Sequence, residues 1–109
     1  MRSQDIRGLL ERGKRRRTKN LDVFFAASPA SRSRMGIVVP KHGHRIVDRN
    51  RLKRRLREIG RRELLPELDA GNEAIDVLVR ARRTAYRAGY EDLKRELSEA
   101  LETMWSRSS

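Results

Sequence analysis

The densest group of side chains able to do chemistry lies between residues 49 and 57, which read Arg-Asn-Arg-Leu-Lys-Arg-Arg-Leu-Arg. Guanidinium and ammonium groups bind phosphate, and arginine does so through paired hydrogen bonds. On a helix, Leu52, Leu56 and Ile59 would share one apolar stripe. The neighbouring face would carry Arg49, Asn50, Lys53, Arg54, Arg57 and Arg61, with Arg51 on a separate flank. The segment therefore predicts a helix that buries leucines and offers cations to a polyanion.

An ordinary amphipathic helix with a solvated basic face is the alternative interpretation of this segment. Like charges at i,i+4 destabilise a free helix, and a phosphate ribbon would remove that repulsion. The charge is also unevenly placed: residues 1–20 and 49–65 each hold eight basic and two acidic side chains, whereas residues 91–109 hold three basic and five acidic. Such clustering favours a localised anion-binding surface over general solubility.

The chain as a whole has 109 residues, a formal charge of +12 and no cysteine. That length suits one domain, which we assign to residues 1–109. Without cysteine the chain has no thiolate nucleophile, disulfide or Cys-ligated metal. No stretch approaches the roughly 20 apolar residues that span a bilayer, and the start does not resemble a signal peptide. We therefore expect a soluble, cytoplasmic protein with a polyanionic partner and no membrane role.

Other chemistry has little support in the sequence. His42 and His44 form a His-x-His pair without a third ligand at suitable spacing, so we expect no metal there. Two-metal phosphodiester hydrolysis needs clustered carboxylates, and those of this chain are dispersed. The carboxylates considered are Asp22, Asp48, Glu58 and Asp76. Because glycine-rich phosphate loops and serine-nucleophile motifs are also absent from the sequence, we predict no catalytic residue.

The elements that must position the basic segment follow from periodicity and from breakers. Helices are predicted over 4–12, from Asp48 to about 65, and over 90–105, with Asp48 as N-cap and Pro66 ending the second helix. Strands are predicted over 21–27, 34–39 and 74–80. The basic run 14–17 is expected to be solvated, and residues 45–47 extend a short strand or lead into the helix. This order indicates an α+β or α/β sandwich with helices packed on one small sheet.

Residues Arg49 to Arg54, followed by Leu56, Arg57 and Glu58, resemble the signature helix of the bacterial ribonuclease P protein subunit family. Residues 35–41 resemble the strand and following lysine of that family, and residues 76–82 resemble its last strand. Residues 5–13 are similar to its first helix and glycine, and Tyr90-Glu91 to the start of its final helix. The resemblance covers about residues 5 to 105, and the basic helix is its most specific part.

The resemblance implies an α+β fold with a small four-stranded sheet flanked by helices in the order αβββαβα. It further implies that the basic helix forms a left-handed crossover between parallel strands, a hand that periodicity cannot predict because right-handed crossovers dominate elsewhere. Members of the family bind a large catalytic RNA, and the holoenzyme removes the 5′ leader from precursor tRNA. The catalytic RNA and precursor tRNA are thus the expected partners. Mg²⁺ would be held by the RNA subunit, with no predictable protein ligand.

Two sets of site residues follow from the resemblance. The surface facing the catalytic RNA would consist of Lys41, Arg45, Arg49, Asn50, Arg51, Lys53, Arg54, Arg57 and Arg61. The single-stranded leader would lie in a cleft between the first helix and the sheet, lined by Ile6, Leu10 and Phe25. The family pattern is not met everywhere: Ile6 and Leu10 replace phenylalanines, Asp22 replaces an aromatic residue, Ile46 an alanine and His42 a lysine. Phe25 is the aromatic residue expected in the cleft, and the alternative is that one of Phe24 and Phe25 packs in the core while the other is partly exposed.

Two other classes of function stay open. A general RNA-binding structural or ribosome-assembly module would need the basic helix but no leader cleft, and the missing aromatic residues favour it. Such a module would bind the catalytic RNA and ribosomal RNA without preference. A stand-alone metal-dependent nuclease would cleave without any RNA subunit, and the dispersed carboxylates argue against it.

Overall fold

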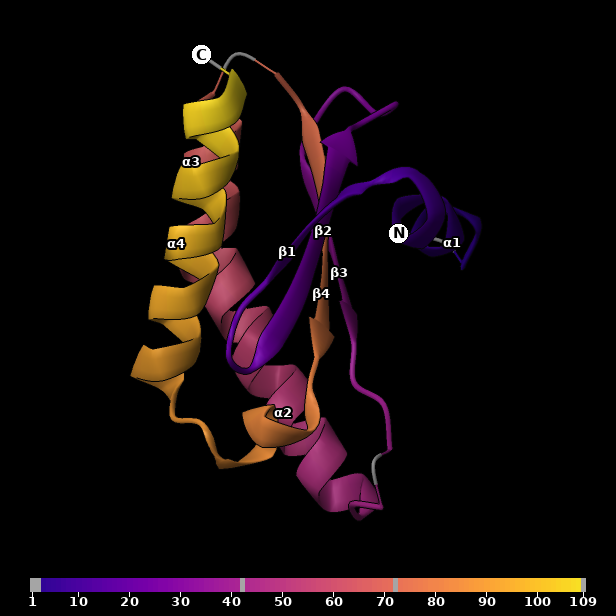
Figure 1. The fold of residues 1–109 in the computed structure, drawn as a ribbon, viewed down its shortest axis with the longest axis vertical. Helices are drawn as coiled ribbons and strands as arrows, with labels where there is room; N and C mark the ends of the chain where they lie inside the picture. The colour runs from indigo at the N-terminus through magenta and orange to yellow at the C-terminus, as the bar shows by residue number, and fades with distance from the viewer. Residues whose placement is uncertain (1–2, 42, 72, 109) are drawn as a thin grey trace.

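One four-stranded sheet organises the chain in a computed structural model that describes residues 3–41, 43–71 and 73–108, with side chains described as far as residue 103. The sheet order is β1-β2-β4-β3, and helices lie on both faces (Figure 1). The elements in chain order are α1 (Ser3–Arg12), β1 (Lys14–Arg17), β2 (Leu21–Ala27), β3 (Arg34–Val38), α2 (Ile46–Ile59), the π-helical turn η1 (Gly60–Leu64), α3 (Leu65–Asp69), β4 (Ile75–Ala81), the 3₁₀ turn η2 (Arg83–Arg87) and α4 (Tyr90–Ser108). The predicted α+β fold is confirmed.

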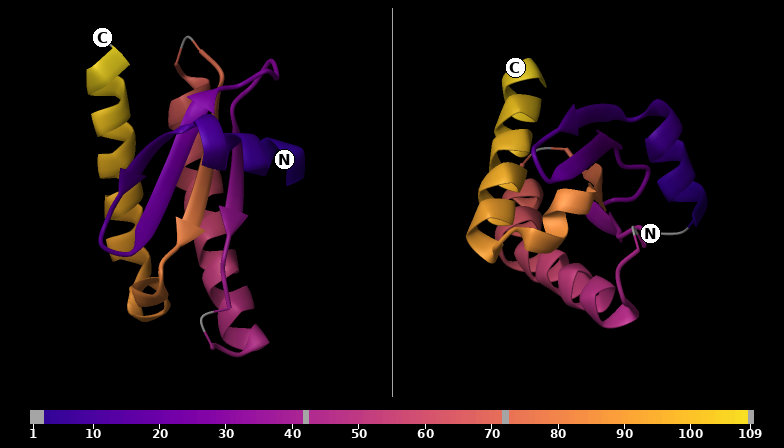
Figure 2. Two further views of the ribbon diagram at one scale, coloured as in Figure 1. Left: turned by 45° about the vertical axis from the view of Figure 1, so that its right-hand side comes forward. Right: turned by 60° about the horizontal axis from the view of Figure 1, so that its bottom comes forward.

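The basic helix α2 lies in the connection between two neighbouring parallel strands. β2 pairs antiparallel with both β1 and β4, whereas β3 pairs parallel with β4. A parallel pair needs a crossover connection, and α2, η1 and α3 supply it. In the left view of Figure 2 both strands descend, α2 passes behind the sheet, and β4 lies to the left of β3. This path is the left-handed crossover that the resemblance implied.

The two faces of the sheet are covered by different helices (Figure 1). Leu21, Val23 and Val79 point into the larger core, which also takes the predicted apolar stripe of α2: Leu52, Leu56 and Ile59. On the opposite face, Phe24 and Leu78 pack with Leu9 of α1 in a smaller cluster. Successive side chains of β2 therefore point alternately to the larger core and to the face that α1 covers. All three members of the α2 stripe are buried, as predicted.

Residues 14–17 are exposed, as predicted, but they also form the edge strand β1, which was not predicted for this segment. Their pairing with β2 uses backbone groups, so it does not depend on apolar side chains. All four side chains are exposed, and the alternation that normally signals a strand is therefore missing. The basic side chains on an edge strand also disfavour pairing with further strands.

The start of α2 differs from the prediction by two residues. Residues 46 and 47 form its first turn, so the strand alternative for 45–47 is wrong, and Arg45 occupies the N-cap position without a side-chain cap bond. Asp48 lies within the first turn, where a carboxylate favours the positive end of the helix dipole. A carboxylate near a helix start can thus act through the dipole without capping.

Pro66 does not end the helical path. The chain continues through η1 into α3, where Pro66 occupies one of the first two positions. A proline there loses no helical hydrogen bond, because the first N–H groups of a helix have no partner within it. The predicted helix end at residue 65 is therefore wrong, and the helical path extends to Asp69.

Candidate nucleic-acid interface

The solvent side of α2 and of the following turn η1 carries a stripe of polar side chains, which we call the cationic stripe because all but one of them are arginines. Asn50, Arg54 and Arg57 of α2 and Arg61 of η1 follow one another at helical spacing and are exposed. Arg51 is exposed on the flank of this stripe, and Lys41 and Arg45 are exposed in the segment leading into the helix. The structure thus brings seven of the nine predicted RNA-facing residues to the surface on and before α2.

Arg49 and Lys53, the other two predicted RNA-facing residues, are half-buried. Arg49 donates from Nη2 to the carbonyl of Val39 at 3.3 Å, and its Nε is a buried donor without a protein partner. On the same helix, Arg55 donates to the carbonyl of Ala88 at 2.9 Å and so links α2 to the segment before α4. Arg49 and Arg55 therefore help to fix the position of α2 as well as adding to its charge.

Glu58 neutralises part of the charge at one end of the cationic stripe, so the two ends of the stripe differ in free positive charge. At the C-terminal end, the carboxylate of Glu58 pairs with Arg61 at 3.0 Å and with Arg62 at 2.7 Å. Within the part of the chain that the structure describes, neither Arg54 nor Arg57 has an intramolecular partner. The full charges of these two arginines remain available to an external anion, whereas that of Arg61 is shared.

Tyr86, which the sequence analysis did not single out, holds the segment that enters α2. Its hydroxyl donates to the carbonyl of Pro40 at 2.9 Å, and its ring stacks on His44 with centroids 3.7 Å apart. Burial raises the pKa of this hydroxyl, an effect that Arg49 opposes and Asp48 reinforces. An aromatic residue in a 3₁₀ turn, 46 positions from its acceptor, carries no periodic signal that would predict this contact.

The histidine pair and the isoleucine at the start of α2 have separate outcomes. His42 lies outside the described residues, so the predictions that involve it stay predictions. His44 packs on Tyr86 as a stacking partner. Ile46 and Val47 are 67% and 60% exposed, which places an apolar pair among the cations at the tip of α2.

On the face of the sheet that α1 covers, one of the residues differs from those predicted to line the leader cleft. Phe25 packs against the larger core on the α2 side, so it does not join Ile6 and Leu10. Phe24 is the phenylalanine that faces α1, and Ile6 packs against the cluster that contains it. Leu10 is 39% exposed, whereas Phe24 is 4% exposed. The structure therefore assigns Ile6, Leu10 and Phe24 to this side, and the ring of Phe24 is mostly covered.

The described carboxylates form no metal centre. Among the described residues, no three His, Cys, Asp or Glu side chains come together in a way that could hold a metal ion. Asp76 instead accepts two hydrogen bonds from Arg34, at 2.9 and 2.6 Å. Burial alone would raise the pKa of Asp76, but the bonds from Arg34 and Ser28 outweigh it and lower the pKa. In the same described part, every helix is too short or too polar to cross a membrane.

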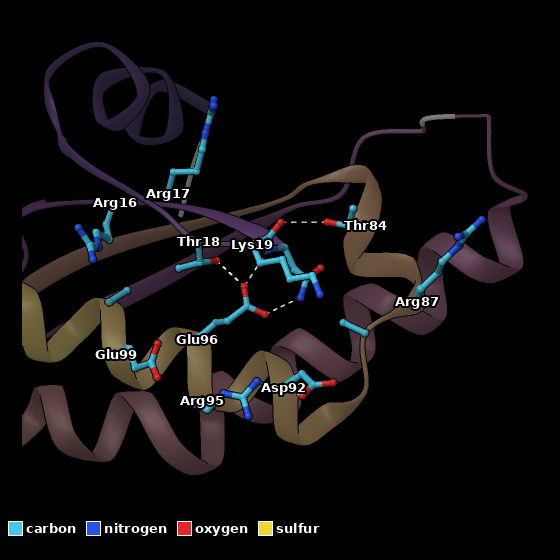
Figure 3. Close-up of a pocket in the computed structure, with 13 residues that line it drawn as sticks. Arg16, Arg17, Thr18, Lys19, Thr84, Arg87, Asp92, Arg95, Glu96 and Glu99 are labelled. Atoms are coloured by element: carbon cyan, nitrogen blue, oxygen red, sulfur yellow. Dashed lines mark hydrogen bonds and ion pairs between the residues drawn. The ribbon is translucent and has the colours of Figure 1, made fainter.

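A hollow of about 540 Å³ lies between the β1–β2 turn and α4 (Figure 3). Its centre is the buried carboxylate of Glu96, which accepts from Thr18 Oγ1 at 2.5 Å and from the backbone N–H and side-chain amide of Asn20 at 2.8 and 2.5 Å. Basic and acidic side chains alternate around the rim, where Arg95 pairs with Asp92 at 3.2 Å. These contacts join the turn to the helix, and the polar atoms at the centre are already paired.

Comparison with known proteins agrees with this architecture. The family described as Ribonuclease P matches residues 1–105. A ribonuclease P protein component from Thermus scotoductus is 42% identical over 92 residues, which cover 84% of this chain and 51% of that protein. The corresponding protein of Kocuria rhizophila is 36% identical over 91 residues, covering 84% of this chain and 77% of its own length. The chain spans about half the length of the Thermus relatives it matches.

The fold has a solved counterpart. The RNase P protein from Thermotoga maritima superimposes with a TM-score of 0.79 at 26% identity, covering 94% of each chain. A match at this level over nearly all of both chains includes the sheet, the crossover helix and the flanking helices. With the family match over residues 1–105, this establishes that the chain belongs to the ribonuclease P protein family.

Proposed function

We propose that this chain is the protein component that binds the catalytic RNA of ribonuclease P and assists removal of the 5′ leader from precursor tRNA. The observation that carries the proposal is the cationic stripe on α2, in a chain of this family. Arg54 and Arg57 are exposed and unpaired within the described residues, on a helix that packing and the Arg55–Ala88 bond hold in place. A helix held in place presents these guanidinium groups on one face, where each can bind a phosphate through paired hydrogen bonds.

The contribution of the protein to the reaction would be electrostatic. The catalytic RNA would hold the Mg²⁺ ions that activate water and stabilise the leaving oxygen. Folding this RNA brings phosphates close together, and their repulsion must be offset by cations. The arginines of α2 would supply fixed positive charge at that place, so less Mg²⁺ would be needed to reach the active RNA fold.

A general RNA-binding module is the second candidate, and one observation favours it. Phe24 is the aromatic residue on the α1-side face, and it is only 4% exposed. Its ring therefore offers little surface on which a leader base could stack. A protein that served only as an RNA scaffold would bind through α2 and would leave cleavage unchanged.

Cleavage of a precursor tRNA at low Mg²⁺ separates the two candidates. The catalytic RNA of the source organism is assayed alone, with the wild-type protein, and with a double variant, Arg54→Ala with Arg57→Ala. We expect correct 5′ cleavage only with the wild-type protein at the lowest Mg²⁺ concentration, and a higher Mg²⁺ requirement with the variant. Arg95→Ala removes an exposed arginine from the far helix α4, and this control should behave as wild type. Equal Mg²⁺ dependence with and without protein would overturn the proposal, and equal affinity for ribosomal RNA would favour the scaffold.

A further inference from the structure

We propose that a hollow between α2 and β3 is a nucleotide site, which takes one unstacked base of the catalytic RNA on an apolar floor and the adjoining phosphate on the cations of its rim. The hollow has a volume of about 420 Å³ and lies between β3 and the helical path that runs from α2 through η1 into α3. We call it the β3 hollow. Pockets for small ligands have volumes of about 300–1,000 Å³, so the β3 hollow is large enough for a base.

The floor of the β3 hollow is apolar. Met35 and Ile37 of β3 and Leu65 of α3 line it, and each is only half-buried, so the floor presents apolar surface to solvent. Gly60 also lines the hollow and lies directly against Met35. Aliphatic side chains pack on the flat face of a base, and methionine sulfur makes favourable contacts with aromatic rings. Covering this floor with a base would stabilise a complex without the salt dependence of phosphate contacts.

Three cations form the rim of the same hollow. Lys53, Arg57 and Arg61 line it at a spacing of four residues, which places them on one side of the helical path. Within the described residues, Lys53 and Arg57 have no intramolecular partner, whereas Arg61 pairs with Glu58. Of the described residues that line the β3 hollow, none is acidic. The apolar floor therefore lies beside positive charge, the combination that a base and its phosphate require.

The π turn η1 brings Leu65 to the floor. The N–H of Leu65 donates to the carbonyl of Gly60, five residues earlier, so this turn holds one residue more than an α-helical turn. One extra residue rotates all later positions by about 100°. In an uninterrupted helix Leu65 would lie in nearly the same direction as Arg54 and face solvent, because about three full turns separate them. After the rotation it lies on the side of Arg57, and Leu64 is buried in the core.

The position of the β3 hollow favours a base of the RNA that binds α2. Arg57 and Arg61 belong both to its rim and to the cationic stripe, so an RNA that follows the stripe reaches the hollow. Bases within a double helix are stacked and cannot enter a hollow, whereas bases of loops and bulges can be splayed out and packed against side chains. Assignment of the base to the catalytic RNA rests on the function proposed above, but the nucleotide site itself does not.

Two adjacent residues of β3 supply a matched pair of variants. Ile37 lines the hollow, whereas Val38 packs against the cluster on the opposite face of the sheet. Both are half-buried and β-branched. Ile37→Thr removes apolar surface without changing charge, so we expect it to weaken binding to the catalytic RNA roughly fivefold at every salt concentration, with the salt slope unchanged. Val38→Thr should bind as wild type.

A rim variant should show the complementary pattern. Lys53→Gln removes a cation, so we expect weaker binding together with a salt slope lower by about 0.9. Filter binding of the catalytic RNA over a range of salt measures these variants, and thermal unfolding establishes that each is folded at the assay temperature. Equal affinities of folded Ile37→Thr and Val38→Thr would refute the base site.

A second measurement leaves the protein unchanged, so it is insensitive to any folding defect of the variants. Isotope labelling of the methionine methyl groups gives one NMR signal for each of the three methionines, and the signal of Met35 is identified by its loss in Met35→Leu. A base packed on the thioether shifts this signal upfield through its ring current. We expect that shift when the catalytic RNA is added to the wild-type protein. A Met35 signal that keeps its position in the complex would overturn the proposal.

Failure of this site is distinguishable from failure of the proposed function. If the protein assists cleavage but the Met35 signal does not shift in the complex, the β3 hollow is not a base site and the proposed function stands. If the protein gives the catalytic RNA no assistance, titration of the free protein with adenosine monophosphate and with ribose phosphate decides. An upfield shift of the Met35 signal with adenosine monophosphate alone would support the site. Equal responses to the two compounds, or a response to neither, would refute it.

Discussion

The backbone N–H of Asn20 donates a 2.8 Å hydrogen bond to the carboxylate of Glu96, a residue 76 positions later in the chain. Glu96 also accepts from the side chains of Asn20 and Thr18, so one α4 carboxylate satisfies three donors of the β1–β2 turn (Figure 3). That turn fixes β1 relative to β2. Arg15 and Arg17 of β1, together with Arg80 of β4, donate hydrogen bonds to the carboxylate of Asp22, and we call these four residues the Asp22 cluster. The far helix α4 therefore helps to position a surface on the opposite face of the sheet.

Replacement of Glu96 by alanine should destabilise the fold. The substitution leaves the buried N–H of Asn20 without its acceptor, and an unsatisfied buried donor costs about 1–3 kcal/mol. We expect the free energy of unfolding in urea to fall by roughly 2–3 kcal/mol. Glu99→Ala, on the exposed side of the same helix, is the control and should change stability by less than about 0.5 kcal/mol. Equal losses in the two variants would show that the turn contact does not account for the effect, and helix propensity could not explain the losses because alanine is the better helix former.

The Asp22 cluster should contribute stability that depends on pH. Burial alone would raise the pKa of Asp22, but hydrogen bonds from Arg15, Arg17 and Arg80 outweigh burial and lower the pKa below its ordinary value. A lowered pKa in the folded state stabilises the fold above the unfolded pKa, about 3.9, and the benefit is lost as pH falls through the folded value. The difference in unfolding free energy between wild type and Asp22→Asn should therefore be largest above about pH 5 and shrink below about pH 4.

Urea unfolding of both proteins between neutral and acid pH tests this prediction. The other carboxylates titrate in both proteins, so their contributions cancel in the difference. A difference that stays constant through the acid range would mean that the Asp22 charge contributes nothing to folding.

Gly60, the first residue of η1, lies against Met35 of β3. A Cβ atom there would contact the Sδ of Met35, although the backbone has ordinary helical angles. Because the half-buried Met35 side chain is flexible and can shift, Gly60→Ala should destabilise the protein by no more than about 1 kcal/mol, with the gain that alanine normally brings to a helix acting in the opposite direction. Shortening the neighbour in a double variant, Gly60→Ala with Met35→Ala, should cost less than the sum of the two single changes.

Gly8→Ala is the matched control for this overpacking. Gly8 is also helical, but its added Cβ would meet only the side chain of Arg12 at an ordinary 3.7 Å. This variant should be neutral or more stable by up to about 1 kcal/mol. Thermal unfolding of the four variants gives the comparison, and additive losses for Gly60 and Met35 would contradict the packing argument.

Helices and strands whose buried side chains recur at a regular spacing could be predicted from the local sequence pattern. The 3.6-residue spacing of Leu52, Leu56 and Ile59 predicted α2 and its buried side, because packing on the sheet requires that spacing. The edge strand β1 has no such spacing, since all four of its side chains are exposed. The hand of the crossover came from the family resemblance, because no local pattern determines it.

The two charged surfaces were predictable to different degrees. The cations of α2 are close in sequence, so their common face follows from helix geometry alone. The Asp22 cluster joins residues of three strands, and Arg15 meets Arg80 only because β1 and β4 both pair with β2. The placement of Phe25 depended on which face of β2 lies under α1, which alternation leaves undecided. The prediction of this second surface was limited by the unknown pairing register of distant strands, and not by the types of the residues.

The ion pairs at the end of α2 predict an order among its arginines in RNA binding. Arg57 has no intramolecular partner in the described part of the chain, whereas Arg61 already pairs with Glu58 at 3.0 Å. Contact of Arg61 with a phosphate must therefore break or share an existing ion pair. We expect Arg57→Ala or Arg54→Ala to weaken binding to the catalytic RNA by about 1 kcal/mol each and to reduce the salt slope by about 0.9.

Arg61→Ala should have a smaller effect on both quantities, because it also removes an interaction that competes with the RNA. A further variant, Glu58→Gln, releases Arg61 without removing any cation, and it should strengthen binding and steepen the salt dependence. Filter binding of the catalytic RNA at several salt concentrations measures all four variants. A larger loss with Arg61→Ala than with Arg57→Ala would mean that η1, and not the last turn of α2, forms the main phosphate contact.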